Sequence, residues 1–422
     1  MIDKELIKSI ISEGYEYIPQ VSIIHRDVKM EEYSNYVFIG VRQAGKSYTL
    51  YEQMQKKIAD GVPIENLVYI NFDDERLYGM QAEQLDLILQ ANYSVREEKP
   101  ILFFDEIQNV KGWENFARRL ANQKYEVYIT GSNAKMLSRD IQTVLGGRYI
   151  DIAVYPFSFK EFLSAKGIKL GSRWQYGQKR GEIERAFEEY FQWGGFPELV
   201  RFKEKRVWLN GLYNRIFFND LIVRNKIKNE EGLRLTLRKL AESLCQPLSY
   251  TRLCNMIKAV GVSCSTSTVI EYINHFTDSC LIFPVQNFAS RFVEKATTKK
   301  FYFVDNGLLN LFLLNNQSAL LENICAIEMQ KRYNSRLYYY LQHNIEVDFY
   351  VPEENLAVQV SYKLNDENTI KRETNALAKL HQLHPLEKAL IITKDEEKTI
   401  TINDLTIEFI PVWKWLLENE QK

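Results

Sequence analysis

The first half of the chain alternates short apolar runs with longer amphipathic stretches. Four apolar runs each end in glycine or polar residues: Tyr36–Ile39, Leu67–Phe72, Ile101–Phe104 and Tyr125–Thr130. Runs of this length bounded by turn residues are typical of buried strands in a parallel sheet. With a helix before the first run and another over Ser47–Ala59, the pattern predicts an α/β core over residues 1–160.

The second half begins with charged amphipathic helices over residues 161–239, which are predicted to form a helical lid. Residues 240–300 then give a helix, a second helix capped by Ser249, a turn at Gly261, a third helix and a strand. This order is the outline of a winged helix-turn-helix. The spacing i, i+3, i+4, i+7 predicts that the core of the third helix is Val269, Tyr272, Ile273 and Phe276.

Residues 301–422 return to a mixed pattern of a helix near 320–332 and the apolar strands LYYYLQ, EVDFYV, AVQVSY and ALIITK. A further α/β domain is expected there. Several domains are expected in any case, because 422 residues exceed what one hydrophobic core usually serves.

Composition narrows the possible partners and the compartment. The 54 basic and 55 acidic residues leave a net charge of −1, so any site for nucleic acid must be local. The five cysteines form no C-x-x-C, which favours a reducing compartment. No stretch approaches about 18 consecutive apolar residues, so a soluble cytoplasmic protein without membrane contact is predicted. His381 and His384 form an isolated H-x-x-H followed by Pro385, which does not favour a metal site.

The first chemical signal follows the first predicted strand, where GVRQAGKS matches G-x-x-x-x-G-K-[ST]. The glycines allow backbone N–H groups to turn around an anion, and a lysine and a helix N-terminus add positive charge. The sequence therefore predicts a loop that binds the phosphates of ATP, made of Gly40, Arg42, Gln43, Ala44, Gly45, Lys46, Ser47 and Tyr48.

The second signal is ILFFDE, an apolar strand that runs into Asp105 and Glu106. Asp105 and the Ser47 hydroxyl are predicted to hold Mg²⁺, and Glu106 to orient and deprotonate the attacking water while Lys46 stabilises the phosphates. ATP and Mg²⁺ are thus the predicted cofactors. The acids of Asp73-Asp74-Glu75 are interpreted as solvated loop residues.

The segments GVRQAGKS, FFDEIQ, ITGSN, GGRY, YPFSFKEF and GGFPELV occur in that order. In this the chain resembles a family of bacterial and archaeal AAA+-type ATPases with a C-terminal domain of unknown function. The later segments IEYINHFTDSCLI, FYFVDNGLLN and EVDFYV extend the resemblance over nearly the whole chain. The resemblance implies an ATP-hydrolysing core and says little about the biological role.

Two further site residues are predicted. In AAA+ ATPases the sheet has a strand between the one before the phosphate loop and the one that ends in the acids, and a polar residue at the end of that middle strand senses the γ-phosphate. This suggests Ser132 or Asn133, with a simple turn as the alternative. Arg148 is interpreted either as an arginine finger, in cis or for a neighbouring subunit of a homo-oligomer, or as a surface ion-pair residue. Arg215 and Arg224 of the lid are expected to form surface ion pairs.

The last domain is similar to the PD-(D/E)xK nuclease fold, which holds Mg²⁺ with a helix acid, a strand Asp and an E-x-K. The resemblance assigns the first two positions to Glu328 and Asp348. The third departs, because Gln359-Val360-Ser361 replaces E-x-K, and Lys363 is the candidate substitute for the missing cation. A retained fold without nuclease activity is predicted.

The partner is left open between DNA and a protein. The exposed side of the third helix of the winged-helix region has no Lys or Arg. DNA contact would therefore depend on basic side chains around it: Arg252, Lys258, Arg291, Lys295, Lys299 and Lys300. Two functions are compatible with the sequence. The first is an ATP-hydrolysing enzyme acting on or near DNA, and the second is a slow ATP-dependent switch or scaffold whose C-terminal half docks a protein.

Overall fold

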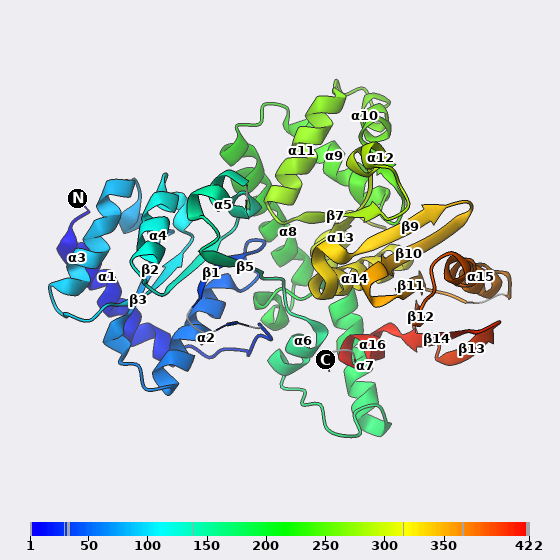
Figure 1. The fold of residues 1–422 in the computed structure, drawn as a ribbon, viewed down its shortest axis with the longest axis horizontal. Helices are drawn as coiled ribbons and strands as arrows, with labels where there is room; N and C mark the ends of the chain where they lie inside the picture. The colour runs from blue at the N-terminus through cyan, green and yellow to red at the C-terminus, as the bar shows by residue number, and fades with distance from the viewer. Residues whose placement is uncertain are drawn as a thin grey trace. The chain divides into compact units, whose positions relative to one another are not determined.

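The computed structural model describes residues 2–28, 30–31, 34–137, 139–314, 316–364 and 367–418. The chain divides into two compact units. The first comprises residues 1–155 with 278–280, and the second comprises 156–277 with 281–422. In Figure 1 the strands of the first unit are blue to green, and those of the second are yellow-green to red. The ribbon colours therefore separate the two sheets described below.

Among the described residues of the first unit, five strands form one parallel sheet in the order β2-β3-β4-β1-β5. The strands are β1 (Asn35–Ile39), β2 (Leu67–Asn71), β3 (Ile101–Asp105), β4 (Val127–Gly131) and β5 (Tyr149–Ala153). This sheet confirms the predicted α/β core with a parallel sheet. Strand β4 lies between β1 and β3, so the residues that follow these three strands are neighbours at one edge of the sheet.

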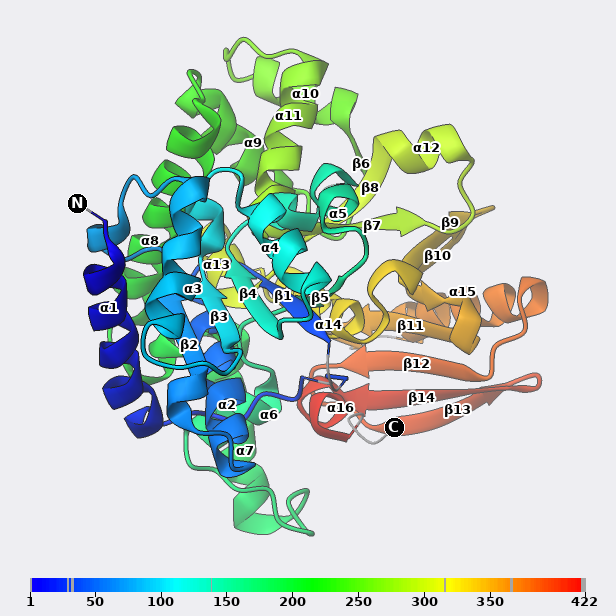
Figure 2. The same ribbon diagram turned by 60° about the vertical axis from the view of Figure 1, so that its left-hand side comes forward.

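The two faces of this sheet differ in chemistry. One face presents aliphatic side chains such as Val37, Val68 and Leu102 to the helices α1 (Lys4–Tyr17), α3 (Asp86–Tyr93) and α4 (Trp113–Asn122) (Figure 2). The other face is aromatic, and α2 (Lys46–Ala59) packs there through Tyr51 on Tyr69. A short helix α5 (Arg139–Leu145) precedes β5. The alternation along each strand thus builds a two-sided core.

The second unit begins with helices. They are α6 (Phe159–Ala165), α7 (Gly177–Trp193), α8 (Lys205–Arg215) and α9 (Glu230–Glu242). The chain continues from α8 as a π-helical segment, Ile216–Val223. Asp220 of this segment is buried and pairs with Arg224 at 3.1 Å, whereas Arg215 is exposed. Arg224 therefore forms an ion pair, as expected, but with a buried acid and not on the surface.

Within the described residues, a single nine-stranded sheet runs through the rest of this unit in the order β13-β14-β12-β11-β10-β9-β7-β8-β6. The strands are β6 (Leu248–Ser249), β7 (Ile282–Asn287), β8 (Thr298–Phe303), β9 (Tyr338–Gln342), β10 (Ile345–Val351), β11 (Leu356–Ser361), β12 (Lys388–Thr393), β13 (Lys398–Ile402) and β14 (Leu405–Pro411). The helices are α10 (Tyr250–Lys258), α11 (Thr266–Asp278), α12 (Phe292–Thr297), α13 (Asn306–Asn310), α14 (Gln317–Tyr333), α15 (Glu367–Leu383) and α16 (Val412–Glu418). The predicted boundary between residues 300 and 301 falls inside β8.

The predicted core of the third helix, now α11, is confirmed, because Val269, Tyr272, Ile273 and Phe276 are all buried. Strand β8 pairs with β6 on one side and β7 on the other. Strand β7 in turn pairs in parallel with β9 through Gln286–Tyr338 and Asn287–Tyr339. The sheet therefore continues from the region predicted as a winged helix into the region predicted as nuclease-like.

The Asp305 carboxylate ties the end of α7 to the start of α13. Its oxygens accept the backbone N–H groups of Gly195 at 2.7 Å, Gly307 at 2.8 Å and Leu308 at 3.3 Å. Gly194 has φ 77°, and a Cβ there would lie 2.0 Å from Asp305 Oδ1. Gly194 is therefore required by this close approach, and at Gly195 a Cβ would lie 2.3 Å from the Phe157 carbonyl oxygen.

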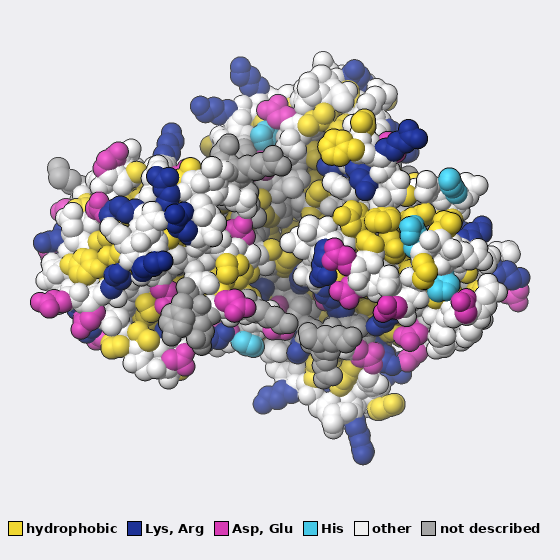
Figure 3. Space-filling view, in the orientation of Figure 1, with side chains coloured by type: hydrophobic (Ala, Val, Ile, Leu, Met, Phe, Trp, Pro, Cys, Tyr) yellow, Lys and Arg dark blue, Asp and Glu magenta, His cyan; other side chains and the backbone are white. Residues whose placement is uncertain are grey.

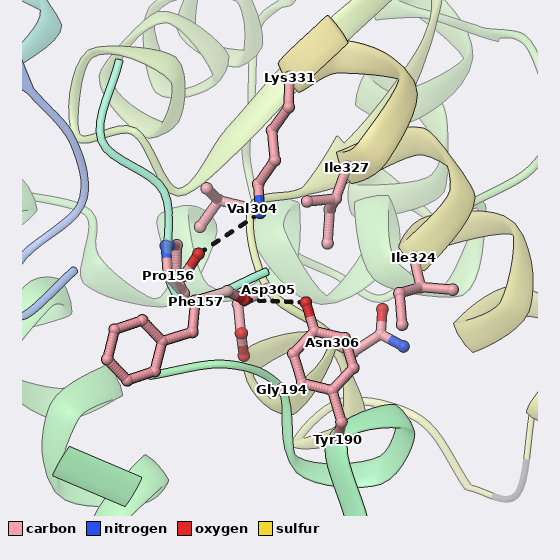
Figure 4. Close-up of a pocket in the computed structure, with 10 residues that line it drawn as sticks. All are labelled: Pro156, Phe157, Tyr190, Gly194, Val304, Asp305, Asn306, Ile324, Ile327 and Lys331. Atoms are coloured by element: carbon pink, nitrogen blue, oxygen red, sulfur yellow. Dashed lines mark hydrogen bonds between the residues drawn. The ribbon is translucent and has the colours of Figure 1, made fainter. Parts of the chain in front are cut away.

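Figure 4 shows the small cavity beside Asp305. Lys331 of α14 donates to the Pro156 carbonyl at 3.4 Å, and the Tyr190 hydroxyl of α7 donates to the Phe157 carbonyl at 2.9 Å. Segments far apart in sequence are thus joined by buried polar contacts. No helix in the described part of the chain is long and apolar enough to span a membrane.

Candidate nucleotide site

The loop between β1 and α2 needs glycine at both ends for different reasons. At Gly40 a Cβ would lie 2.0 Å from the Val154 carbonyl oxygen, because Val154 N–H donates to Ile39 at 2.7 Å on the neighbouring strand. Gly45 has φ 103° immediately before α2, a conformation that side chains disfavour. Gln43 also has a positive φ, of 62°. The loop therefore has a strained, compact backbone that ends at a helix N-terminus.

Lys46 points into this loop. Its side chain is only 4% exposed, and its Nζ donates to the carbonyls of Gly40 and Val41, both at 3.2 Å. The same ammonium lies 3.4 Å from Glu106 Oε1. The lysine predicted to bind phosphate thus lies between the loop and the acid at the end of β3.

Asp105 ends β3 and is 2% exposed. Thr130 donates to its Oδ1, Tyr69 donates to its Oδ2 at 2.9 Å, and Ser47 also hydrogen-bonds to the carboxyl. Burial and the neighbouring Glu106 raise the pKa of Asp105. The structure therefore brings Ser47 and Asp105 together, and their oxygens are the hard ligands that Mg²⁺ prefers, so the residues fit the implied ion.

Glu106 follows in a left-handed conformation, with φ 55°. Its N–H donates to Thr130 Oγ1 at 3.0 Å, and its carboxylate accepts from Gln108 and from Ser132 N–H at 3.3 Å. Burial acts to raise the pKa of Glu106, but the Lys46 charge and the hydrogen bonds from Gln108 and Ser132 outweigh it, and the pKa is lowered. Glu106 is thus an ionised, oriented carboxylate beside the loop.

Ser132 lies where the sequence expects it, after β4 and beside Glu106. The side chain is buried, and the Gln108 amide donates to Ser132 Oγ at 3.4 Å. Gly131 is needed before it, because a Cβ there would lie 1.9 Å from Met136 Sδ. The geometry is compatible with a group that contacts the γ-phosphate, and that role remains a prediction.

The other predicted residues surround the loop at different depths. Arg42 is half-buried and its charge lowers the pKa of Glu106, and Ala44 N–H closes a turn on Val41 at 3.2 Å. Tyr48 is exposed, with its ring 5.5 Å from that of Tyr51. Arg148 is exposed, and its Nη1 donates to the carbonyls of Leu145 and Gly146 at the end of α5. The arginine-finger interpretation of Arg148 remains a prediction.

Sequence reasoning missed four side chains that shape this site: Arg26, Tyr69, Gln108 and Thr130. Arg26 is buried, and its guanidinium donates to Ala44 in the loop at 3.2 Å and to Tyr155. Thr130 could have been found, because it immediately precedes the GSN segment at the end of a predicted strand. Gln108 could have been found too, because it lies in the FFDEIQ segment two residues after Glu106. Arg26 and Tyr69 carry no local signal, since they reach the site from other elements.

The second unit holds a polar cavity of about 640 Å³. Glu322 of α14, Asp348 of β10 and Gln359 of β11 line it, with Arg372 and Lys379 of α15. The prediction that Glu328 is the helix acid of this site was wrong. Glu328 accepts a hydrogen bond from Arg332 at 2.7 Å, and the acid of α14 that lines the cavity is Glu322. Lys363 is exposed and lies beyond the end of β11.

The positively charged side chain beside the carboxylates of this cavity is not the predicted Lys363 but a lysine of β8. Lys300 of β8 is completely buried, and its Nζ lies 3.1 Å from Asp348, 3.5 Å from Glu322 and 3.6 Å from Glu346. The prediction that Lys300 contributes to a basic DNA-binding surface is therefore wrong. A lysine with no exposed surface cannot contact a phosphate backbone.

Gln359 is a bridge between strands. Its Oε1 accepts the Asp348 N–H at 2.7 Å, and its Nε2 donates to the Glu346 carbonyl at 3.1 Å and to Glu373 at 2.7 Å. Among the described side chains, no group of three or more His, Cys, Asp or Glu is arranged to hold a metal ion. The Gln359 amide therefore joins β11 to β10 and to α15.

Comparisons with known proteins agree with the geometry of the first unit. Residues 33–163 match a family described as AAA domain, and residues 184–319 match one described as a domain of unknown function. The first unit thus contains an AAA-type, P-loop ATPase-like domain.

Two relatives match nearly the whole chain. An uncharacterized protein of Methanocaldococcus jannaschii is 32% identical, and the match covers 99% of this chain and 96% of that protein. An uncharacterized protein of Haemophilus influenzae is 32% identical, with 90% of this chain and 94% of that protein covered. The chain belongs to the same family as these two proteins.

Solved structures with some similarity include the Walker-type ATPase of Pyrococcus abyssi, which is 15% identical with a TM-score of 0.41 and covers 74% of this chain and 96% of that one. Another is CDC6P of Pyrobaculum aerophilum, which is 12% identical with a TM-score of 0.28 and covers 76% of this chain and 94% of that one.

Proposed function

We propose that the chain is a Mg²⁺-dependent ATPase that binds ATP at the Gly40–Tyr48 loop. The observation that carries this proposal is the convergence of Lys46, Asp105 and Glu106 where the strands of a parallel sheet end. The loop N–H groups and Lys46 bind the phosphates, and Ser47 and Asp105 hold the ion. Bound Mg²⁺ supplies charge neutralisation at the β- and γ-phosphates. Glu106 orients the attacking water and accepts its proton, and Ser132 contacts the γ-phosphate.

The test of this proposal is ATP affinity. Lys46→Ala removes the phosphate counter-charge and is expected to weaken ATP binding about 100-fold, since a charge-assisted contact contributes roughly 1.5–3 kcal/mol. Lys56→Ala is the matched control, because Lys56 lies on the same helix and is half-exposed. Equal ATP affinity of the two variants in equilibrium dialysis would contradict the proposal.

The winged-helix interpretation of residues 240–300 is part of the proposal. Its support is the order of α9, β6, α10, α11, β7 and β8, with β8 paired between β6 and β7. Arg252, Lys258 and Arg291 are exposed there. On the face drawn in Figure 3, basic and acidic side chains are interspersed. We therefore propose local and weak DNA contact, with protein docking as the alternative.

The salt dependence of DNA affinity distinguishes a DNA partner from a protein partner. If DNA binds, neutralising Arg252, Lys258 and Arg291 to Gln is expected to lower affinity and flatten its dependence on salt, because fewer counterions are released. The control variant replaces three basic residues outside this region, on α7 and α15, by Gln: Lys179, Arg180 and Lys371. A wild-type protein that shows no gel shift at low salt would favour the protein-docking switch.

We also propose that residues 301–422 keep a nuclease-like arrangement without cleaving DNA. The support is the contact of Lys300 with Asp348 and Glu322, together with the hydrogen bonds that occupy Gln359. Metal-assisted hydrolysis needs anionic oxygens free to bind the ion. Nicking of plasmid DNA with Mg²⁺ or Mn²⁺ that disappears in Asp348→Ala would contradict this proposal.

A further inference from the structure

Tyr69 reaches the proposed metal ligand from the strand next to it. On the paired strands β2 and β3, Tyr69 lies opposite Phe103, and Asp105 lies two residues further along β3. Alternation along a strand puts Phe103 and Asp105 on one face, so the phenol of Tyr69 spans the diagonal to the carboxylate. The phenol hydroxyl donates to Asp105 Oδ2 at 2.9 Å.

The two oxygens of Asp105 therefore have separate donors. Thr130 of β4 donates to Oδ1, and Tyr69 of β2 donates to Oδ2. Asp105 is held from both neighbouring strands, while Ser47 contacts the same carboxyl from the start of α2. A carboxylate fixed at both oxygens cannot rotate freely about its last torsion.

We propose that Tyr69 is a positioning residue for Mg²⁺ binding, acting through Asp105. This inference rests on the proposed ATPase function. The tyrosine and Thr130 fix the plane of the carboxylate while Asp105 contacts Ser47. Mg²⁺ demands near-ideal octahedral geometry, so a ligand that is already oriented binds it at a smaller entropic cost.

A purely structural role for the hydroxyl is the alternative. The rings of Tyr69 and Tyr51 pack at 5.3 Å, and their hydroxyls are 3.1 Å apart. Phenylalanine would keep this ring packing. If the hydroxyl of Tyr69 serves only to satisfy Tyr51, its removal should affect stability and leave the ion dependence unchanged. Ion dependence therefore distinguishes the two roles.

The experiment compares Tyr69→Phe with the control Tyr51→Phe, which removes the neighbouring hydroxyl and leaves the donor to Asp105. In Tyr69→Phe the Mg²⁺ concentration for half-maximal ATP hydrolysis is expected to rise about tenfold, since a hydrogen bond to a charged group is lost. At saturating Mg²⁺ both kcat and the KM for ATP should return to the wild-type values, because only the affinity for the ion is changed. Binding of Mn²⁺ in the presence of ADP should weaken in parallel, and Tyr51→Phe should match wild type.

Thr130→Val provides a second variant, because it removes the donor to the other oxygen and should shift the Mg²⁺ requirement in the same direction. An unchanged Mg²⁺ requirement in Tyr69→Phe, with a wild-type enzyme that needs Lys46, would overturn this inference and leave the ATPase proposal intact. A wild-type protein that turns over ATP no faster than Lys46→Ala would overturn both.

Discussion

Lys300 is a charged side chain with no solvent-exposed surface. Burial alone would lower its pKa, but the carboxylates of Glu322 and Asp348 outweigh burial and raise the pKa of Lys300 well above its ordinary value. Burial, with the charge of Asp348, raises the pKa of Glu322 in spite of Lys300, and Tyr302 donates to that carboxyl at 2.7 Å. The lysine thus acts as an internal counter-ion for a carboxylate pair that would otherwise need an external cation.

Replacing this counter-ion should be costly. Lys300→Met leaves the buried Glu322 and the half-buried Asp348 without this counter-charge and is expected to lower the free energy of unfolding by about 3 kcal/mol or more. The neighbouring Lys299 is half-buried and its pKa is lowered by burial, so Lys299→Met should cost much less. Urea titration measures the free energy of unfolding of both variants. Adding Asp348→Asn to Lys300→Met should recover part of the loss, and equal losses for the two single variants would contradict the counter-ion role.

At the level of elements, the end of α7 is fixed by the Asp305 contact. Gly194→Ala places a Cβ 2.0 Å from Asp305 Oδ1 at a backbone φ of 77°. The variant is expected to lose about 2–4 kcal/mol of stability, because either the carboxylate or the helix end must move.

Gly181 is the matched control for that variant. It lies inside α7, and a Cβ there would meet nothing within 4 Å. Gly181→Ala should therefore be neutral or stabilise the protein by up to about 1 kcal/mol through helix propensity. Thermal or urea unfolding that ranks Gly194→Ala as no worse than Gly181→Ala would show that the double glycine is not required by packing.

The same contact should give the protein a characteristic pH dependence. Burial raises the pKa of Asp305 to about 6 from 3.8, although three backbone N–H groups oppose the shift. Because the folded-state pKa is the higher one, its contribution to stability is complete below about pH 4 and is lost as pH rises through 6. The loss is about 3 kcal/mol at most.

Urea unfolding of wild type and Asp305→Asn between pH 4 and 7 measures this contribution. The stability of wild type relative to the variant should fall as pH rises across that interval, because the asparagine does not titrate. A difference that stays constant or increases with pH would mean that the folded protein keeps Asp305 ionised.

Across the whole molecule, the sequence predicted those site residues that lie close together in one segment of the chain. The loop Gly40–Ser47 and the acids after β3 are each read from one segment, and the parallel sheet follows from apolar runs. Tyr69 was missed because it reaches Asp105 from a neighbouring strand, and strand order is not written in any single segment.

The second unit shows the same limit more strongly. Glu322 and Glu328 lie on one helix, and only the side of the helix that faces the sheet decides which of them reaches Asp348. The cation comes from Lys300, 48 residues before its partner, across a sheet that no motif predicts. Asp348, which the sequence singled out, does line the cavity, and its neighbours there could not be predicted from any one segment.

In the proposed ATPase, Glu106 activates water for hydrolysis of ATP held by Lys46. The most direct test is single-turnover ATP hydrolysis by wild type and Glu106→Gln, with ATP affinity measured for both. We expect Glu106→Gln to bind ATP nearly as wild type does and to hydrolyse it about 100- to 1,000-fold more slowly. Hydrolysis by Glu106→Gln at the wild-type rate would contradict it.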